Sequence, residues 1–211
     1  MVDTWHNEKI GTKVVEALKK NNFDAIYFAD KEEAVEYALG FVKEGMQVAF
    51  GGSMTLKELG LPKRVEEKGA YTLNHNAPGL SAEEKTDIRR QQLLSDVFFS
   101  STNALTLDGY LVNVDGVGNR VAAMSFGPKK VVVITGINKI TRDIESALDR
   151  VKLIAAPKNT KRLEKPNPCG KTGICMDCQG ETRICNIYTV MKKKPTASDI
   201  TVIIVGEILG Y

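Results

Sequence analysis

The chain has 211 residues, of which 43% are apolar and 26% are charged, and its formal net charge is +3. This composition is typical of a globular protein with one sizeable core, and the small net charge gives no argument for nucleic-acid binding. The N-terminus lacks a basic start followed by an apolar run, and no segment approaches the ~20 apolar residues that a membrane span needs. We therefore predict neither a signal peptide nor a membrane protein.

The first half of the chain alternates segments of helical and strand periodicity. Asp30 with Glu33 forms a capping-box pattern at a helix start, and Thr55 with Glu58 repeats it. Gly45 is suited to end a helix. We predict helices over 7–20, 30–45 and 55–59, and strands over 25–29, 46–50 and 71–73.

The second half continues this alternation, with the pair Ser81 and Glu84 expected to cap one helix and Thr141 expected to start another. Helices are predicted over 81–94 and 141–151, and strands over 97–100, 110–114, 130–135, 187–191 and 201–206. Most of these strands are almost wholly apolar, which indicates that both faces of the sheet are covered. The fold class is therefore α/β, with a Rossmann-like, mostly parallel sheet and helices on both faces.

The first candidate site is the loop 51–55, which joins a strand to a helix. Gly51 and Gly52 allow the backbone to approach a ligand closely, while Ser53 and Thr55 supply hydroxyl groups. Ligands of open α/β sheets bind beyond the carboxyl ends of the strands, where this loop is expected. The spacing is not that of a P-loop. The alternative is a tight turn with a helix cap.

The second candidate is the loop 103–109. Asn103, Thr106 and Asp108 carry polar side chains, which either bind polar ligand groups or satisfy the turn. Asp108 and Gly109 also fit a chain reversal into the following strand. The residues alone leave these two interpretations equal.

The third candidate is the loop 115–120. Its two glycines, at 116 and 118, resemble a dinucleotide loop, but the third glycine of that fingerprint is absent, so no NAD is predicted. Asp115, Gly118, Asn119 and Arg120 remain as candidate ligand-binding residues. Arg120 offers a bidentate fork for a carboxylate or phosphate, or forms an ion pair with Asp115 that braces the loop.

These motifs together resemble the LUD-domain (lactate utilisation) family. The segments 51–55, 103–109, 115–120 and 127–131 occur in the order typical of that family, and the resemblance extends over about 10–206. It implies a fold similar to the ribose-5-phosphate isomerase and CoA-transferase superfamily. It also implies a role in oxidising lactate to pyruvate alongside iron–sulfur partner proteins. The resemblance provides no catalytic residue.

All four cysteines fall within one segment, as Cys169, Cys175, Cys178 and Cys185. A cluster without a signal peptide indicates a metal site and a reducing, cytoplasmic compartment rather than dispersed disulfides. Four thiolates suit zinc or an iron–sulfur cluster, and we expect the sulfurs to lie within ligand distance of one another. The redox partners implied by the resemblance favour iron–sulfur; the alternative is four free thiols. The loop 160–186 is treated as a metal-binding insertion in a single domain over 7–211.

His75 lies in a loop, where it is either a general base or, more commonly, a water-exposed side chain.

Three functions follow from these features. The first is an enzyme or enzyme subunit in hydroxy-acid oxidation that binds an anionic small molecule at the three loops. The second is a redox or regulatory protein in which the cysteine site works and the α/β domain is scaffold. The third, a zinc-stabilised nucleic-acid module, is disfavoured because aromatic residues are sparse around the cysteines. The oligomeric state is open, with a homodimer as one expectation.

Overall fold

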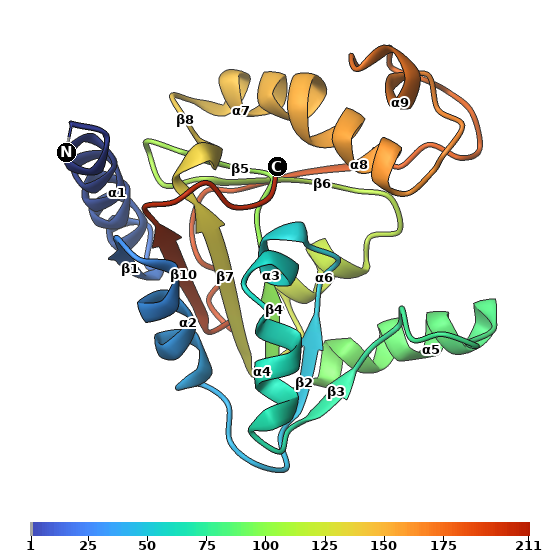
Figure 1. Ribbon diagram of the computed structural model, residues 1–211, viewed down its shortest axis with the longest axis horizontal. Helices are drawn as coiled ribbons and strands as arrows, with labels where there is room; N and C mark the ends of the chain where they lie inside the picture. The colour runs from blue at the N-terminus through green and yellow to red at the C-terminus, as the bar shows by residue number, and fades with distance from the viewer. Residues whose placement is uncertain (1) are drawn as a thin grey trace.

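The computed structural model describes residues 2–211 and contains two sheets, of which the larger is wholly parallel (Figure 1). Its strand order is β1 (Asp24–Phe28), β10 (Ile200–Val205), β7 (Lys130–Gly136), β4 (Val97–Ser100), β2 (Gln47–Phe50) and β3 (Tyr71–Leu73). Because all six strands point the same way, their carboxyl ends meet at one edge. The predicted α/β class with a mostly parallel sheet is confirmed.

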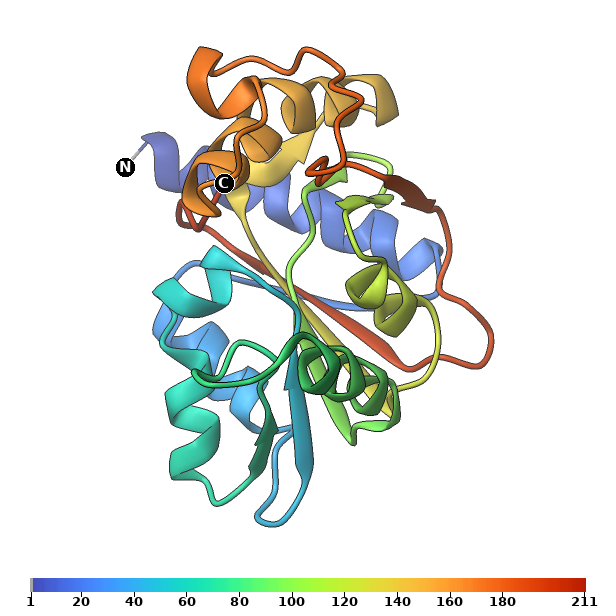
Figure 2. The same cartoon turned by 90° about the vertical axis from the view of Figure 1, so that its right-hand side faces the viewer.

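Both faces of the parallel sheet are buried, as the apolar strands required. In β7, Val132 and Ile134 face one core cluster, while Val131 and Val133 face the other. This alternation follows the period of two in a strand. The first face is covered by α2 (Lys31–Leu39), α3 (Met54–Glu58) and α4 (Leu61–Glu67). The second is covered by α1 (Val2–Lys20) and α6 (Asn119–Ser125), and Figure 2 shows α6 opposite α3 and α4.

The smaller sheet has the order β8 (Ile140–Thr141), β5 (Ala104–Thr106), β6 (Leu111–Asp115) and β9 (Ile187–Met191), and β6 is antiparallel to both its neighbours. The segment 110–114 was expected in the parallel sheet and instead belongs here. A second sheet was not expected, because apolar strands of similar length look alike whichever sheet they join.

The smaller sheet and a helical layer lie over the carboxyl edge of the parallel sheet (Figure 1). The helices are α7 (Ile144–Arg150), a π-helical turn (Val151–Ala155), α8 (Ala156–Arg162) and the short α9 (Cys169–Thr172). The remaining elements are α5 (Ala82–Gln91) and three-residue 3₁₀ turns at Gln92–Leu94 and Ile137–Lys139. Among residues 2–211, no helix is long and apolar enough to cross a membrane.

Helix starts were predicted with mixed success. The capping box of Ser81 and Glu84 is confirmed, and the Asp30 side chain accepts hydrogen bonds from the backbone of Glu32 and Glu33. The cap proposed at Thr55 is wrong, because Ser53 caps α3 and Thr55 is buried. Asp143 rather than Thr141 caps α7.

The turn between β5 and β6 confirms the reversal predicted at Asp108 and Gly109. Gly109 has φ +75°, and its backbone lies against α1, where a Cβ atom would be 2.7 Å from the nitrogen of Leu18 and 2.8 Å from the carbonyl carbon of Ala17. We expect Gly109→Ala to lower the free energy of unfolding by roughly 2–4 kcal/mol, since a strained φ adds to a backbone clash.

Chemical denaturation of the variant checks this prediction. Gly52→Ala is the matched control, because its φ is not positive and its Cβ would meet no atom within 4 Å, so it should stay within about 0.5 kcal/mol of the parent. Equal stability of the two variants would show that the turn does not pack as described.

Candidate functional site

A half-open cavity lies at the carboxyl edge of the parallel sheet, beneath α8 and the smaller sheet. Its volume is about 100 Å³, well below the ~300–1,000 Å³ of pockets for drug-sized ligands, so it suits a small molecule. We call it the carboxyl-edge cavity; its lining includes Gly52, Ser53, Ser101, Thr102, Asn103, Arg120, Lys139, Asn159, Arg162, Cys185 and Tyr211. Neighbouring strands β2, β4 and β7 therefore each deliver a loop to one place.

The three candidate loops meet only in part. Gly52, Ser53, Asn103 and Arg120 line the cavity. Two other predicted residues support the lining: the Thr55 hydroxyl lies 2.8 Å from Lys139 Nζ, and Asp115 pairs with Arg120. A Cβ on Gly51 would lie 3.0 Å from the Arg120 side chain and from Ser100 Oγ, so a side chain there would crowd the site. Gly118 and Asn119 form the start of α6, which positions Arg120.

Thr106, Asp108 and Gly109 do not join the site. They lie at the far end of the β5–β6 hairpin, where the Asn21 side chain donates to the carbonyl oxygens of Asp108 and Gly109. The Thr106 hydroxyl accepts from the Tyr110 backbone N–H. Of the loop 103–109, only its first residue reaches the cavity, because β5 carries the rest of the chain away from it.

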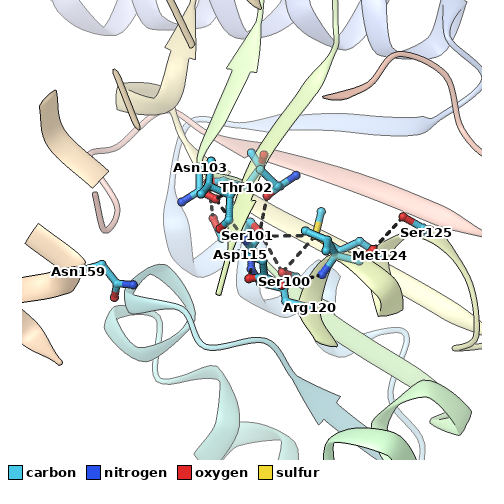
Figure 3. A network of polar contacts seen from close by, with 12 residues as sticks. Ser100, Ser101, Thr102, Asn103, Asp115, Arg120, Met124, Ser125 and Asn159 are labelled. Carbon is cyan, nitrogen blue, oxygen red and sulfur yellow. Dashed lines mark hydrogen bonds and ion pairs between the residues drawn. The ribbon is translucent and has the colours of Figure 1, made fainter. Parts of the chain in front are cut away.

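Arg120 is buried at the base of the cavity and is held on all sides (Figure 3). Its Nε donates to Asp115 at 3.2 Å, and its Nη1 donates to Asn113 Oδ1 at 2.6 Å and to the Ser101 carbonyl at 3.2 Å. Its Nη2 donates to Asn103 Oδ1 at 3.0 Å and to the Val114 carbonyl at 2.8 Å. Burial lowers the pKa of the Arg120 guanidinium, while the Asp115 charge opposes that shift. All five N–H donors of the guanidinium thus have protein acceptors. This favours the interpretation that Arg120 braces the loop over the interpretation that it binds an anionic ligand.

Lys139 is the main site residue that the sequence reasoning missed. It follows the carboxyl end of β7, is only 3% exposed, and donates from Nζ to Thr55 Oγ1 at 2.8 Å and to Ser101 Oγ at 3.1 Å. Burial lowers its pKa to about 7, and the positive charges of Arg150 and Arg120 add to the effect. A lysine just beyond a strand with a long apolar run was the available signal.

Two further arginines frame this region. Arg150 is buried and donates to the carbonyl oxygens of Asn138 and Asn103, which fixes the backbone on either side of the cavity. Arg162 is exposed at the rim, where its Nε and Nη2 donate to Asn159 Oδ1, and Nε also reaches the Tyr211 hydroxyl. Its Nη1 makes no hydrogen bond within residues 2–211. Arg162 did not stand out in the sequence because α8 was not predicted, whereas Arg150 lies within the predicted helix 141–151 but was not singled out.

The four cysteines line a second, smaller cavity, which we call the cysteine cavity. Its volume is about 10 Å³, and it shares Ala156, Ile184 and Cys185 with the carboxyl-edge cavity. Burial raises the pKa of the Cys185 thiol to about 11, and the other three cysteines add to this shift, which reflects their proximity. No disulfide links these four cysteines. Because Ala156, Ile184 and Cys185 line both cavities, the two cavities share one wall.

The cysteine segment is ordered by polar contacts of its own. Arg183 donates to the carbonyl oxygens of Cys178 and Cys185 and pairs with Asp177 at 2.8 Å. Asn167 Nδ2 lies 3.4 Å from Cys178 Sγ. Within residues 2–211, however, no three histidine, cysteine, aspartate or glutamate side chains are grouped as ligands of a metal ion. The ligand arrangement expected from the spacing is not shown, and the metal site stays a prediction.

His75 is buried, so the expectation of a water-exposed side chain is wrong. Its Nδ1 accepts from Gln92 Nε2 at 2.9 Å, and the same amide donates to the Leu73 carbonyl. Burial lowers the His75 pKa, and Arg89 lowers it further. Because His75 lines neither cavity, its contacts are those of a packed, neutral histidine.

The fold and the cavity define an α/β protein with a small polar site at the carboxyl edge of a parallel sheet. The LUD domain family model matches residues 11–205, and the chain belongs to that family. This membership supports a role related to lactate utilisation. No curated protein matches the chain.

One solved structure shares the fold at low sequence identity, and two others are similar over about half of the chain. A DUF162 family protein from Deinococcus radiodurans is similar with a TM-score of 0.51 and 13% identity, over 94% of this chain and 98% of that one. The eIF2B beta structure from Chaetomium thermophilum is similar over 55% of this chain and 44% of that one, with 16% identity and a TM-score of 0.38. A D-ribose-5-phosphate isomerase in complex with phospho-erythronic acid is similar over 54% of each chain, with 16% identity and a TM-score of 0.35. The first likeness concerns the fold alone, and the other two carry no argument.

Proposed function

We propose that the chain is an enzyme or subunit of a system that oxidises lactate or a related 2-hydroxy acid. The anionic substrate binds in the carboxyl-edge cavity, beside a four-cysteine metal site. Family membership supports the area of metabolism, and the cavity supports the ligand class.

The observation that carries the proposal is the charge of the cavity lining. Arg120, Lys139 and Arg162 line it, and among the described residues no aspartate or glutamate does so. The Arg120 charge is offset by Asp115, but the rim arginine Arg162 has no acidic partner within ion-pair distance in the part of the chain described. A lining of this kind favours a small anion, and Ser53, Asn103 and Asn159 add groups that can bond to a hydroxyl.

The cysteine cavity supports a metal close to this ligand. Four thiolates gathered in so small a space would be unfavourable without a cation, and thiolate sulfur is a ligand for both zinc and iron–sulfur clusters. Cys169, Cys175, Cys178 and Cys185 would hold the metal. A volume of about 10 Å³ has room for about one small ion, but the thiols would have to regroup around either metal, because no three of them are placed as ligands within residues 2–211.

The iron–sulfur cluster and the zinc ion would have different roles. An iron–sulfur cluster would carry electrons to or from partner proteins, while zinc would order the loop. In either case Cys185 belongs to the wall between the two cavities, so metal loading would affect the ligand cavity directly.

A redox or regulatory role for the cysteines alone is the second candidate. It is favoured by the intermediate exposure of Cys175, Cys178 and Cys185, which leaves the segment accessible to a partner. Binding of a hydroxy acid distinguishes the two, since only the first function requires it.

Titration calorimetry with lactate tests the first function. Arg162→Ala should weaken binding by about 1–3 kcal/mol, the usual effect of losing one charge-assisted hydrogen bond. Arg90→Ala is the control, because Arg90 is an exposed arginine on α5 that pairs with Asp87 and does not line the cavity.

Lactamide, the uncharged analogue, should bind far more weakly than lactate. Equal binding of the two compounds, or unchanged affinity in Arg162→Ala, would show that the cavity does not select an anion.

A further inference from the structure

The surroundings of Lys139 are those of a reactive lysine and not those of a structural lysine. Its amino group is buried, and in the part of the chain described its hydrogen bonds are to the hydroxyls of Thr55 and Ser101. No carboxylate lies within ion-pair distance there. A buried ammonium without a counter-ion is costly, and an apolar residue would serve packing better. Such an arrangement in a cavity indicates a functional group.

The charges around Lys139 favour a neutral amine. Arg150 on α7 and Arg120 on α6 are the positive groups that act on it, and Glu58 on α3 is the opposing carboxylate. The Glu58 carboxylate is itself engaged by the backbone N–H of Gly210 at 2.6 Å. Desolvation next to other cations is a recognised way in which proteins activate a lysine.

We propose that Lys139 forms an imine with the carbonyl carbon of a 2-oxo acid bound in the carboxyl-edge cavity. The inference rests on the proposed function for its ligand class, since a 2-oxo acid is the oxidised form of a 2-hydroxy acid. It adds a covalent step that the binding proposal does not require.

The step is balanced without any further reactant. The Nζ lone pair attacks the carbonyl carbon, the C–N bond forms, and a proton passes from nitrogen to the former carbonyl oxygen. The C–O bond then breaks, and the oxygen leaves as water with the two amine hydrogens as the C=N bond forms. Thr55 and Ser101 are placed to relay these protons, because their oxygens contact Nζ and lie 3.4 Å from each other. A hydroxyl that accepts from an ammonium can donate to a neutral amine.

Reductive trapping tests the proposal on the full chain. The protein is incubated with pyruvate or glyoxylate and sodium cyanoborohydride, and intact mass and peptide mapping locate the adduct. We expect one adduct per chain, on Lys139, and its loss in Lys139→Met. Lys158→Met is the matched control, because Lys158 is an exposed lysine on α8, and it should retain the adduct.

The pH dependence adds an independent readout. The neutral fraction of an amine rises as pH passes its pKa, so trapping at Lys139 should increase through about pH 7 and then level off. An ordinary lysine, with a pKa of about 10.4, would still be gaining reactivity at pH 9.

Each outcome decides between the proposals. If pyruvate binds reversibly but no adduct forms at Lys139 in the parent protein, the imine is wrong and anion binding stands. If neither binding nor an adduct is found, both proposals fail. Adducts spread over surface lysines, and kept in Lys139→Met, would also overturn the imine. Mapping on the parent protein gives this answer even if the variant does not fold.

Discussion

Replacing Arg120 with methionine should lower the free energy of unfolding by about 3–5 kcal/mol, the usual effect of removing one partner of a buried ion pair. The loss would leave Asp115 half-buried without its cation, and the side-chain oxygens of Asn113 and Asn103 without their shared donor. Methionine keeps most of the side-chain volume, so the effect reports on hydrogen bonds and charge.

Denaturant unfolding measures this effect, with Arg64→Met as the control. Arg64 also forms two ion pairs, with Glu32 at 2.8 Å and Glu36 at 2.6 Å, but both glutamates are well exposed. Replacing Arg64 should therefore lower the free energy of unfolding by at most about 1 kcal/mol. If Arg120→Met is as stable as the parent yet loses affinity for lactate, Arg120 is a ligand fork and the brace is wrong.

Replacing Cys175 and Cys178 together with serine should abolish bound metal and make the segment 160–186 sensitive to protease near Lys171. A structural thiolate site contributes on the order of 10 kcal/mol to local folding. Besides the polar contacts of Arg183 and Asn167, little else orders the segment, since Ile174 and Met176 are exposed and pack little apolar area. The parallel sheet should remain folded, because its two core clusters do not include these cysteines.

Metal analysis and visible spectra after anaerobic purification measure the first effect, and limited proteolysis measures the second. Met176→Ser is the control in the same segment, since it changes an exposed side chain and removes no thiol. Metal content near zero in the parent protein, with the segment still protected, would contradict the metal site.

Local signals in the sequence were sufficient for most of the parallel sheet. Apolar runs such as Val131–Ile134 predict buried strands, because neither face of such a run can remain in water. The chain reversal at Gly109 and the capping box at Ser81 were also visible, since both depend on residues only a few positions apart. The sequence did not show which of two neighbouring hydroxyl residues caps α3. Ser53 and Thr55 are both suitable N-cap residues, and only the packing of the fold buries Thr55 and leaves Ser53 as the cap.

The position of the candidate site could be predicted from the sequence, but the full set of residues that line it could not. Parallel strands bring their carboxyl ends together, so the loop 51–55 and Asn103 were expected near each other, and both reach the cavity. Lys139 was missed because its significance lies in burial beside Thr55 and Ser101, which are distant in sequence.

The sequence by itself determined the fold class, the family and the edge of the sheet at which the loops gather, because these follow from local periodicity and motif order. Only the tertiary structure decided the roles of individual side chains. Arg120 became a brace because five acceptors from the segments 101–103 and 113–115 surround it. Lys139 became a desolvated amine because it is buried beside Thr55 and Ser101, with the charges of Arg150 and Arg120 nearby. Charge, burial and hydrogen bonding at such positions depend on neighbours that sequence spacing does not bring together.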